Sequence, residues 1–488
     1  MRRFSILFHS HRLTTISLGI VVLAVGGYFF ADWRSEVRWK AYCAEARARG
    51  VKLTLAEFAA PQMPEAENFA ALPMFKAIAS GGVQRPMELP KAEGAPPSFG
   101  SPIKGERIDW KAWQKLFKDA HWITDTTNEP VRDVLRGLEH YEPQFKEWSE
   151  WRTRRRCRFH LNTEDIMAMP LPHLSTFLDA AKLFSLRMRA HLAVGDSASA
   201  LEDFREGLQT YSRLSEEPVL LTGLVRIANL HVILAAFGEG LEQHAWTDAE
   251  LQTVDMDLAS ARVPAAYVQA FSSERGFGNQ FEEEIRNMSP TQRARKFGAI
   301  DSANILKTGD SPPAWVYSLL PKWVYRDNQL RSNLHMDELL SRVTNDQTQF
   351  QPSAGTPTSL ENLEGLKSYY YFVFTRSNAI FNEIANRFVH LQTQVDEARV
   401  AIALERHRLA HGSYPHALAE LVPEFLPSLP LDTFTQNSLI YRQKEGGTFL
   451  LYGVGKNRMD DGGTLDPKLS DNRQRDDIWL YAPPPVQP

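Results

Sequence analysis

The chain contains one uninterrupted apolar run, residues 13–31, which reads LTTISLGIVVLAVGGYFFA and holds no charged side chain. At about 1.5 Å of helical rise per residue, this run nearly covers the ~30 Å hydrocarbon core of a bilayer. Aromatic side chains close it at 28–30, with Trp33 just beyond, as suits a membrane–water interface. The run therefore predicts a transmembrane helix.

Two alternatives to a retained anchor were weighed. A buried helix of a soluble protein is rarely apolar on every face. A cleaved signal peptide needs small residues before its cut site, and residues 24–26 (Ala-Val-Gly) are a poor version that lies inside the run. A retained signal anchor fits the residues best.

Lysine and arginine residues flank the run on both sides, at 2, 3 and 12 before it and at 34, 38 and 40 after it. A very short basic tail is the easiest segment to keep in the cytoplasm. We therefore expect residues 1–12 to be a cytoplasmic tail and residues 13–31 to cross the inner (cytoplasmic) membrane once. The bulk of the chain would then lie in the periplasm.

The composition of the 488 residues is that of a globular protein, with 43% hydrophobic and 23% charged residues, and the length allows two or three folded units. A net charge of −4 gives no bias toward nucleic acid. Cys43 and Cys157 could form one disulfide, but two distant cysteines carry no framework signal.

Residues 32–345 are expected to form a helical extracytoplasmic domain, clearest over residues 174–243. Ser197 is the expected N-cap after a break at Gly195-Asp196, and Pro218 suits the first turn of the next helix. The segment 190–208, AHLAVGDSASALEDFREGL, resembles a tetratricopeptide-type hairpin. Its consensus is incomplete and no second copy follows after about 34 residues, so one or two solenoid-like hairpins are expected.

Residues 247–250 (Thr-Asp-Ala-Glu) form a capping-box pattern that opens a further helix. A polar stretch at 346–360 reads as a linker. Residues 361–488 then combine a long helix, from about 375 to 411, with a small antiparallel sheet. The buried stripe expected on this helix consists of Leu391, Val395, Ala398, Ile402 and Leu409.

Gly412 followed by Tyr414-Pro415 is a strong helix stop. The runs 438–442 and 448–452 predict a hairpin, and residues 478–481 could supply a third strand. The fold class expected overall is mainly α, with a transmembrane helix, a helical-hairpin body and a small α+β module at the C-terminus.

The C-terminal 100 or so residues resemble the globular part of the type II secretion major pseudopilin. The resemblance rests on residues 412–415 (Gly-Ser-Tyr-Pro), 432–434 (Asp-Thr-Phe), 451–455 (Leu-Tyr-Gly-Val-Gly) and the acidic loop from 460 onward. It implies a small sheet and a calcium site. The carboxylates that would supply calcium ligands are Asp460, Asp461, Asp476 and Asp477.

The chain departs from the pseudopilin pattern at Thr433, at Gly453 and at Asn457-Arg458. A solvated acidic loop is therefore the alternative to calcium binding. A pseudopilin has a Gly–Phe cleavage site and a Glu at the fifth mature position inside its apolar helix. Residues 3–5 lack that Gly and no Glu lies between residues 5 and 31, so processing as a pilin is not expected. The whole layout, including residues 61–75, looks like a group of uncharacterised bacterial envelope proteins.

Three further groups of polar residues are expected to be structural rather than functional. His407 and His411 lie one turn apart, a spacing that can hold a metal, but Arg406 and Arg408 would repel a cation. Residues 152–158 hold five arginines, which could meet anionic lipid or be paired internally. Glu282-Glu283-Glu284 is expected to lie on a solvent-exposed helix face.

Catalytic templates such as a phosphate-binding loop, a Gly-x-Ser-x-Gly elbow or a His-Glu-x-x-His motif do not occur. The leading hypothesis is a non-enzymatic interaction or scaffold protein of the cell envelope. The alternatives are an envelope hydrolase with a site between helices, and an accessory of a type II secretion or pilus-like machine. The partner is unknown apart from the lipid bilayer, and nucleic acid is not expected.

Overall fold

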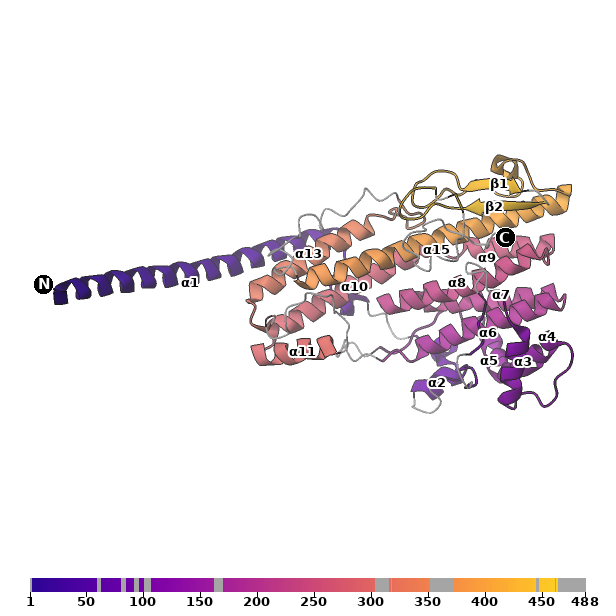
Figure 1. Ribbon diagram of the computed structural model, residues 1–488, viewed down its shortest axis with the longest axis horizontal. Helices are drawn as coiled ribbons and strands as arrows, with labels where there is room; N and C mark the ends of the chain where they lie inside the picture. Colours follow the sequence, from indigo (N-terminus) through magenta and orange to yellow (C-terminus); the bar gives the residue numbers. More distant parts are fainter. Residues whose placement is uncertain are drawn as a thin grey trace. The chain divides into compact units, whose positions relative to one another are not determined.

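The computed structural model describes residues 2–58, 63–79, 85–91, 96–100, 107–161, 170–302, 316, 318–351, 372–444, 447–460 and 462–463 (Figure 1). Within these residues the chain is mainly α-helical, with a small two-stranded antiparallel sheet near the C-terminus. The mainly α prediction and the predicted hairpin are confirmed. The predicted third strand at 478–481 and the linker residues 352–360 lie outside the described residues.

The helices, 3₁₀ turns (η) and strands follow one another in chain order as α1 (Arg2–Ala48), η1 (Leu55–Phe58), η2 (Glu65–Glu67), η3 (Phe69–Ala71), α2 (Pro73–Ala79), α3 (Trp110–Asp119), α4 (Pro130–Leu138), η5 (Glu139–Tyr141), α5 (Glu142–Glu150), α6 (His173–Ala193), α7 (Ser197–Ser212), η7 (Arg213–Glu216), α8 (Leu220–Glu242), α9 (Asp248–Ala259), α10 (Val263–Asn287), α11 (Pro290–Ser302), α13 (Lys322–Leu340), α15 (Phe372–His411), η9 (Leu418–Leu421), β1 (Ile440–Lys444) and β2 (Thr448–Tyr452).

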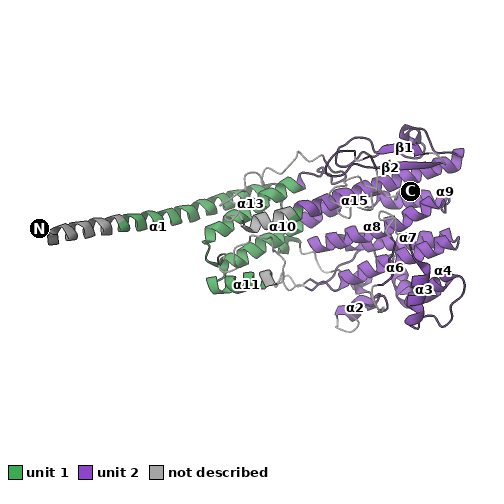
Figure 2. Ribbon diagram, viewed as in Figure 1, with its two compact units in different colours: residues 1–59, 272–339, 355–381 green, residues 60–271, 340–354, 382–488 purple. Residues whose placement is uncertain are grey.

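The chain forms two compact units, coloured separately in Figure 2. Unit 1 comprises residues 1–59, 272–339 and 355–381, and unit 2 comprises residues 60–271, 340–354 and 382–488. Helices α10 and α15 each contribute residues to both units. The domain boundaries expected from the sequence, at residues 345 and 361, stay a prediction. The two units are defined by compactness and do not test those boundaries.

Helix α1 of unit 1 carries an apolar stretch whose side chains are exposed from residue 17 to residue 30. Between residues 18 and 30 its large apolar side chains are exposed, from 44% for Tyr28 to 77% for Leu23. Exposing so much apolar surface to water is unfavourable. The helix is long and apolar enough to be a single-pass anchor, and a signal sequence would have the same character.

Beyond residue 31 the same helix becomes part of a packed core. Tyr42 and Ala46 are buried in a cluster with Leu53 and Leu330. The helix ends before Gly50, whose φ of +76° is the left-handed conformation that glycine adopts at helix ends. Gly50 therefore acts as the C-terminal stop of α1.

Unit 2 is built around α6, α7 and α8, which lie side by side in Figure 1. Phe204 of α7 and Phe237 of α8 pack with ring centroids 5.4 Å apart. Gly207 lets α7 approach α8 closely, because a Cβ there would lie 2.3 Å from a methyl carbon of Ile233. A helical hairpin at 173–212 is thus present, as the sequence predicts.

Helix α8 is also long and apolar enough to cross a membrane by composition alone. However, 56% of its most apolar window is buried inside the structure, whereas the corresponding window of α1 has 0% buried. This burial identifies α8 as a core helix of unit 2, since most of its apolar side chains already have partners. Of the two helices, α1 alone has its apolar surface uncovered.

Two details of helix starts differ from the sequence predictions. The N-cap of α7 is Asp196, whose carboxylate accepts from the backbone N–H of Ser199 at 3.0 Å. Ser197 is the first helical residue instead. Pro218 lies ahead of α8 rather than in its first turn, because the helix begins at Leu220. The capping box between Thr247 and Glu250 is confirmed.

The C-terminal part of unit 2 packs a hairpin near the end of α15. Strands β1 and β2 pair antiparallel, with Ile440 opposite Tyr452. In the expected stripe of α15, residues 391, 395, 398 and 402 are buried, but Leu409 is 44% exposed because it lies near the helix end. Gly412 follows with a φ of +82°, which confirms the predicted stop.

Candidate functional site

A buried ion pair joins α6 and α8 of unit 2. Arg189 of α6 and Glu239 of α8 are 2.9 Å apart, and their side chains are only 3% and 8% exposed. Arg189 also donates from Nη1 to the hydroxyl of Ser185. Its Nε–H has no hydrogen-bond partner. Buried charges at apolar helix faces are costly unless paired, so this pair is an unusual feature of the core.

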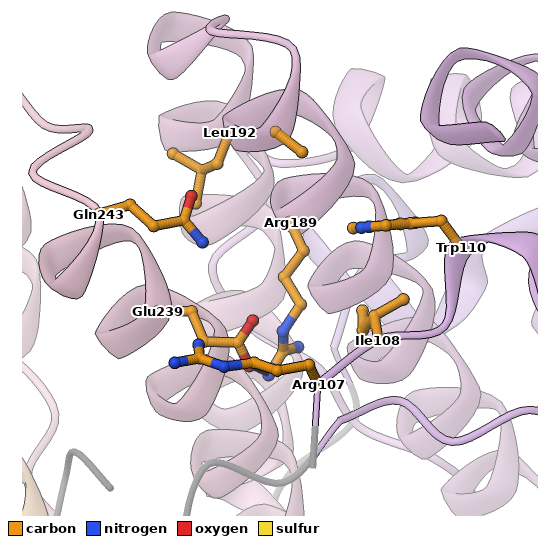
Figure 3. Close-up of a pocket in the computed structure, with 8 residues that line it drawn as sticks. Arg107, Ile108, Trp110, Arg189, Leu192, Glu239 and Gln243 are labelled. Carbon is orange, nitrogen blue, oxygen red and sulfur yellow. Dashed lines mark ion pairs between the residues drawn. The ribbon is translucent and has the colours of Figure 1, made fainter. Parts of the chain in front are cut away.

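A cavity of about 90 Å³ opens beside this pair, between α6, α8 and the segment that leads into α3 (Figure 3). In the figure the side chains of Arg107, Arg189 and Glu239 converge, with Trp110 and Ile108 on one side. The lining residues are Arg107, Ile108, Trp110, Arg189, Leu192, Ala193, Glu239 and Gln243. The pocket therefore has apolar walls and a polar floor.

The charges around this pocket are balanced. Arg107 at its rim is 2.7 Å from Glu242, the last residue of α8. The two guanidinium groups of Arg107 and Arg189 thus face two carboxylates. The pocket lining thus carries no net charge, which suits a neutral polar group better than a free anion.

Sequence reasoning missed this pocket, although a weak signal exists. Glu239 lies in the mostly apolar helix α8, and Arg189 lies among several other charged residues of α6. A charged residue on a mostly apolar helix is the usual sign of a buried pair. Only the packing of α6 against α8, however, establishes that the two residues meet.

No protein-family model, no curated protein and no solved structure matches this chain. The pocket is accordingly identified by its own geometry. Among the residues that the structure describes, no three His, Cys, Asp or Glu side chains gather as metal ligands would.

The predicted calcium ligands are only partly within the structure. Asp460 accepts from the hydroxyl of Tyr452 at 2.6 Å and from the N–H of Gly462 at 2.8 Å. The hydrogen bond from Tyr452 is the main cause that lowers the pKa of Asp460. Asp461, Asp476 and Asp477 lie outside the described residues. Calcium binding at this loop stays a prediction.

The two histidines at the end of α15 engage the backbone. The rings of His407 and His411 stack with centroids 4.3 Å apart. Nδ1 of His407 lies 2.9 Å from the carbonyl oxygen of Ser413, and Nδ1 of His411 lies 3.2 Å from that of His407. These contacts fit the structural interpretation of the two residues.

The arginine run at 152–158 is largely paired within unit 2. Arg156 and Arg158 both bind the carboxylate of Glu216. The guanidinium of Arg154 lies 3.3 Å from the ring centroid of Trp151. Arg152 contacts Glu202 at 3.2 Å. Of the alternatives weighed for this run, internal pairing is the one that these contacts favour.

The interpretation of the glutamate run as a wetted face is wrong for one of its members. Glu283 is exposed, but Glu282 is only 4% exposed and neither of its carboxylate oxygens has a hydrogen-bond partner. Burial raises the pKa of Glu282 to about 8, and the nearby Arg286 offsets this only in part. At neutral pH the Glu282 side chain is therefore mostly protonated.

Neither cysteine forms a disulfide. Cys157 is 2% exposed, and burial raises the pKa of its thiol well above the usual value. Burial also raises the pKa of Cys43. Both thiols are thus poor nucleophiles.

Proposed function

We propose that the chain is a membrane-anchored extracytoplasmic protein of the cell envelope that acts as a non-enzymatic interaction or scaffold protein. The observation that carries the anchor is the exposed apolar stretch of α1, which continues in one helix into the packed residues of unit 1. Because the helix is continuous, no flexible linker separates the apolar stretch from the packed part of unit 1. The anchor would therefore hold unit 1 close to the membrane.

The pocket beside Arg189 supports the interaction role. Its apolar walls from Trp110 and Leu192 and its neutral polar floor suit an amide group of a partner, either in a side chain or in a peptide backbone. The pair between Arg189 and Glu239 would give the pocket a fixed polar lining, because both side chains are buried.

The location is tested with the full chain and a variant that lacks residues 1–31, each carrying C-terminal alkaline phosphatase. We expect the full chain to resist carbonate extraction from membranes and to be active as a phosphatase, which requires export. The truncated chain should be soluble and inactive. A full chain recovered in the soluble fraction, or an inactive membrane-bound reporter, would contradict the proposed placement.

The interaction role is tested by a photo-crosslinking amino acid placed at Gln243 on the pocket rim. The control position is Met256 on α9, which is 66% exposed and does not line the pocket. We expect one adduct of defined mass from Gln243, none from Met256, and its loss in Arg189→Leu. Equal adducts at both positions, or none at either, would count against the pocket as the interaction site.

A second candidate is an accessory of a type II secretion or pilus-like machine. It is favoured by the way the hairpin binds the Gly-x-Tyr-Pro segment: Tyr441 donates to the carbonyl of Pro415 at 2.7 Å, and Gln443 donates to that of Tyr414 at 2.8 Å. Millimolar calcium should then raise the Tm of the full chain, because a ligand of the folded state stabilises it. An unchanged Tm would argue against this candidate.

An envelope hydrolase with its site between helices is the third hypothesis. The pocket between α6 and α8 would be its place, with Glu239 as the carboxylate. Turnover of any substrate by the purified protein should then be lost in Glu239→Gln, whereas a scaffold would show no turnover to lose.

A further inference from the structure

Helices α1 and α13 run in the same direction through unit 1. Arg326, near the start of α13, donates to the carboxylate and backbone carbonyl of Asp32 and to the hydroxyl of Ser35. Further along, Tyr42 of α1 donates to Asp337 of α13 at 3.1 Å. Higher residue numbers meet higher residue numbers, so the two helices are parallel. The beginning of α13 therefore points back toward the apolar run.

The position of that beginning along α1 follows from helix geometry. Lys322 is the first residue of α13, and it precedes Arg326 by about 6 Å of helix axis at 1.5 Å per residue. The same distance back from Asp32 along α1 reaches Tyr28. Tyr28 belongs to the aromatic end of residues 13–31, so Lys322 lies beside the place where hydrocarbon would give way to headgroups.

The residues at this level have the character of an interface. Leu319 is 66% exposed, Lys322 is exposed, and Trp323 is half-buried. Aromatic side chains are enriched at membrane–water interfaces, and a lysine can keep its stem in apolar surroundings while its charge reaches the headgroups. An exposed leucine beside a lysine and a tryptophan is thus well suited to a lipid surface.

Helix α11 adds positive charge near the same end of unit 1. Arg293 of α11 donates to the backbone carbonyl of Leu320 at 2.8 Å, which ties this helix to the segment before α13. The same helix carries Arg295, which is exposed, and Lys296, which is half-buried. In the part of the chain that the structure describes, Arg295, Lys296 and Lys322 have no ion-pair partner.

We propose that residues 319–323 and the basic side chains of α11 bind the headgroup layer of the membrane that α1 crosses, and that they favour anionic phospholipid. This inference rests on the proposed anchor. Leu319 would enter the boundary of the acyl chains, while Lys322 and Arg295 would meet phosphate groups. Unit 1 would then be held against the bilayer by a second contact besides α1.

The test uses the full chain reconstituted into phosphatidylcholine vesicles that contain brominated lipid, with an environment-sensitive fluorophore at one introduced cysteine. The native cysteines are replaced in Cys43→Ser and Cys157→Ala, and this background must keep the Tm of the natural chain. The labelled positions are Leu319→Cys, Leu23→Cys in the apolar run, and Leu334→Cys. Leu334 is the matched control, an exposed leucine on α13 about 18 Å beyond Lys322.

We expect brominated lipid to quench most of the fluorescence at positions 23 and 319 and to leave position 334 unquenched. Quenching at 23 with none at 319 would overturn the headgroup contact and leave the anchor intact. Quenching at 334 as strong as at 319 would overturn it too, since contact would not be confined to the start of α13. A lack of quenching at 23 would overturn the anchor itself.

The preference for anionic lipid is tested on the Leu319→Cys protein by adding phosphatidylglycerol to the vesicles. Quenching at 319 should increase, and the increase should disappear when Lys322→Glu and Arg295→Glu are combined, because the charge attraction is then reversed. An increase that persists in this variant, or no response to phosphatidylglycerol, would overturn the anionic preference.

Discussion

Each compact unit contains a buried glutamate on a long helix, but only one of the two side chains has hydrogen-bond partners. Glu405 of α15 in unit 2 is 2% exposed and accepts hydrogen bonds from Arg408 at 2.6 Å and Tyr414 at 2.8 Å, with His244 Nδ1 at 2.9 Å. Glu282 of α10 in unit 1 is equally hidden but has no hydrogen-bond partner.

The difference appears in the pKa values of the two groups. Burial acts to raise the pKa of Glu405, but hydrogen bonds from Arg408, Tyr414 and His244 outweigh it, so the pKa lies below the usual value. For Glu282 burial acts almost alone and raises the pKa to about 8. Glu405 is thus an ionised carboxylate that accepts several hydrogen bonds in unit 2, whereas Glu282 is a neutral carboxyl group in unit 1.

The largest expected loss of stability comes from removing the Glu405 carboxylate. Glu405→Ala removes the acceptor that Arg408, Tyr414 and His244 share, and it should destabilise unit 2 by about 3 kcal/mol, since each hydrogen bond to a charged group contributes about 1.5–3 kcal/mol. Denaturant unfolding measures the change. The matched control is Glu424→Ala, an exposed glutamate nearby, which should stay within about 0.5 kcal/mol. Equal effects from both variants would show that the hydrogen bonds of Glu405 do not stabilise unit 2.

The second prediction concerns pH, and the two glutamates should respond with opposite signs. The folded-state pKa of Glu282 is raised, so its contribution to stability is complete below the ordinary pKa of 4.5 and is lost as pH rises through about 8. The loss is on the order of a few kcal/mol. The pKa of Glu405 is lowered, so its contribution is lost only as pH falls below 4.5.

Glu282→Gln keeps the shape and removes one ionisation, so it should reduce the loss of stability of unit 1 between pH 6 and pH 9, and the part due to Glu274, whose pKa burial raises to about 7, should remain. The charged and titratable groups near Glu282 are Arg286 and Tyr325, with Arg293 beside Tyr325. Thermal unfolding across this range measures the effect, and Glu283→Gln on the exposed face is the control. An unchanged pH profile in Glu282→Gln would contradict the assignment of a neutral Glu282.

A smaller loss of stability is expected from a substitution at Gly453, beside the β-hairpin. Gly453 stands where the pseudopilin pattern has serine. A Cβ there would lie 2.6 Å from the methyl carbon of Thr393 and 2.7 Å from Oδ2 of Asp432. Gly453→Ser should therefore destabilise unit 2 by about 1–3 kcal/mol through overpacking. Adding Thr393→Ser removes the methyl group and should restore part of the loss, as a double-mutant cycle would show.

The smallest predicted change concerns the cap of α7. Asp196→Ala should cost about 1 kcal/mol, because the N–H of Ser199 loses its acceptor. Ser197→Ala should cost much less, since Ser197 is inside the helix. The reverse order in denaturant unfolding would restore Ser197 as the cap that the sequence alone favours.

Sequence reasoning succeeded where the cause is local. The capping box at Thr247 and Glu250, the helix end at Gly412 and the hairpin at 440–452 depend on residues a few positions apart. It failed at Ser197, because Asp196 offers an equally good capping oxygen one position earlier. It failed at Glu282 because a run of three glutamates looks solvated while one of them points inward.

What the sequence by itself determined is the apolar run, the mainly helical character and most helix ends, because these follow from side chains that are neighbours along the chain. Only the tertiary structure decided which charges are buried and paired. Arg189 meets Glu239, and Arg326 meets Asp32 across 294 positions of sequence. The energy of a buried charge depends on the groups that surround it in space. A single sequence does not say which distant residues become its neighbours.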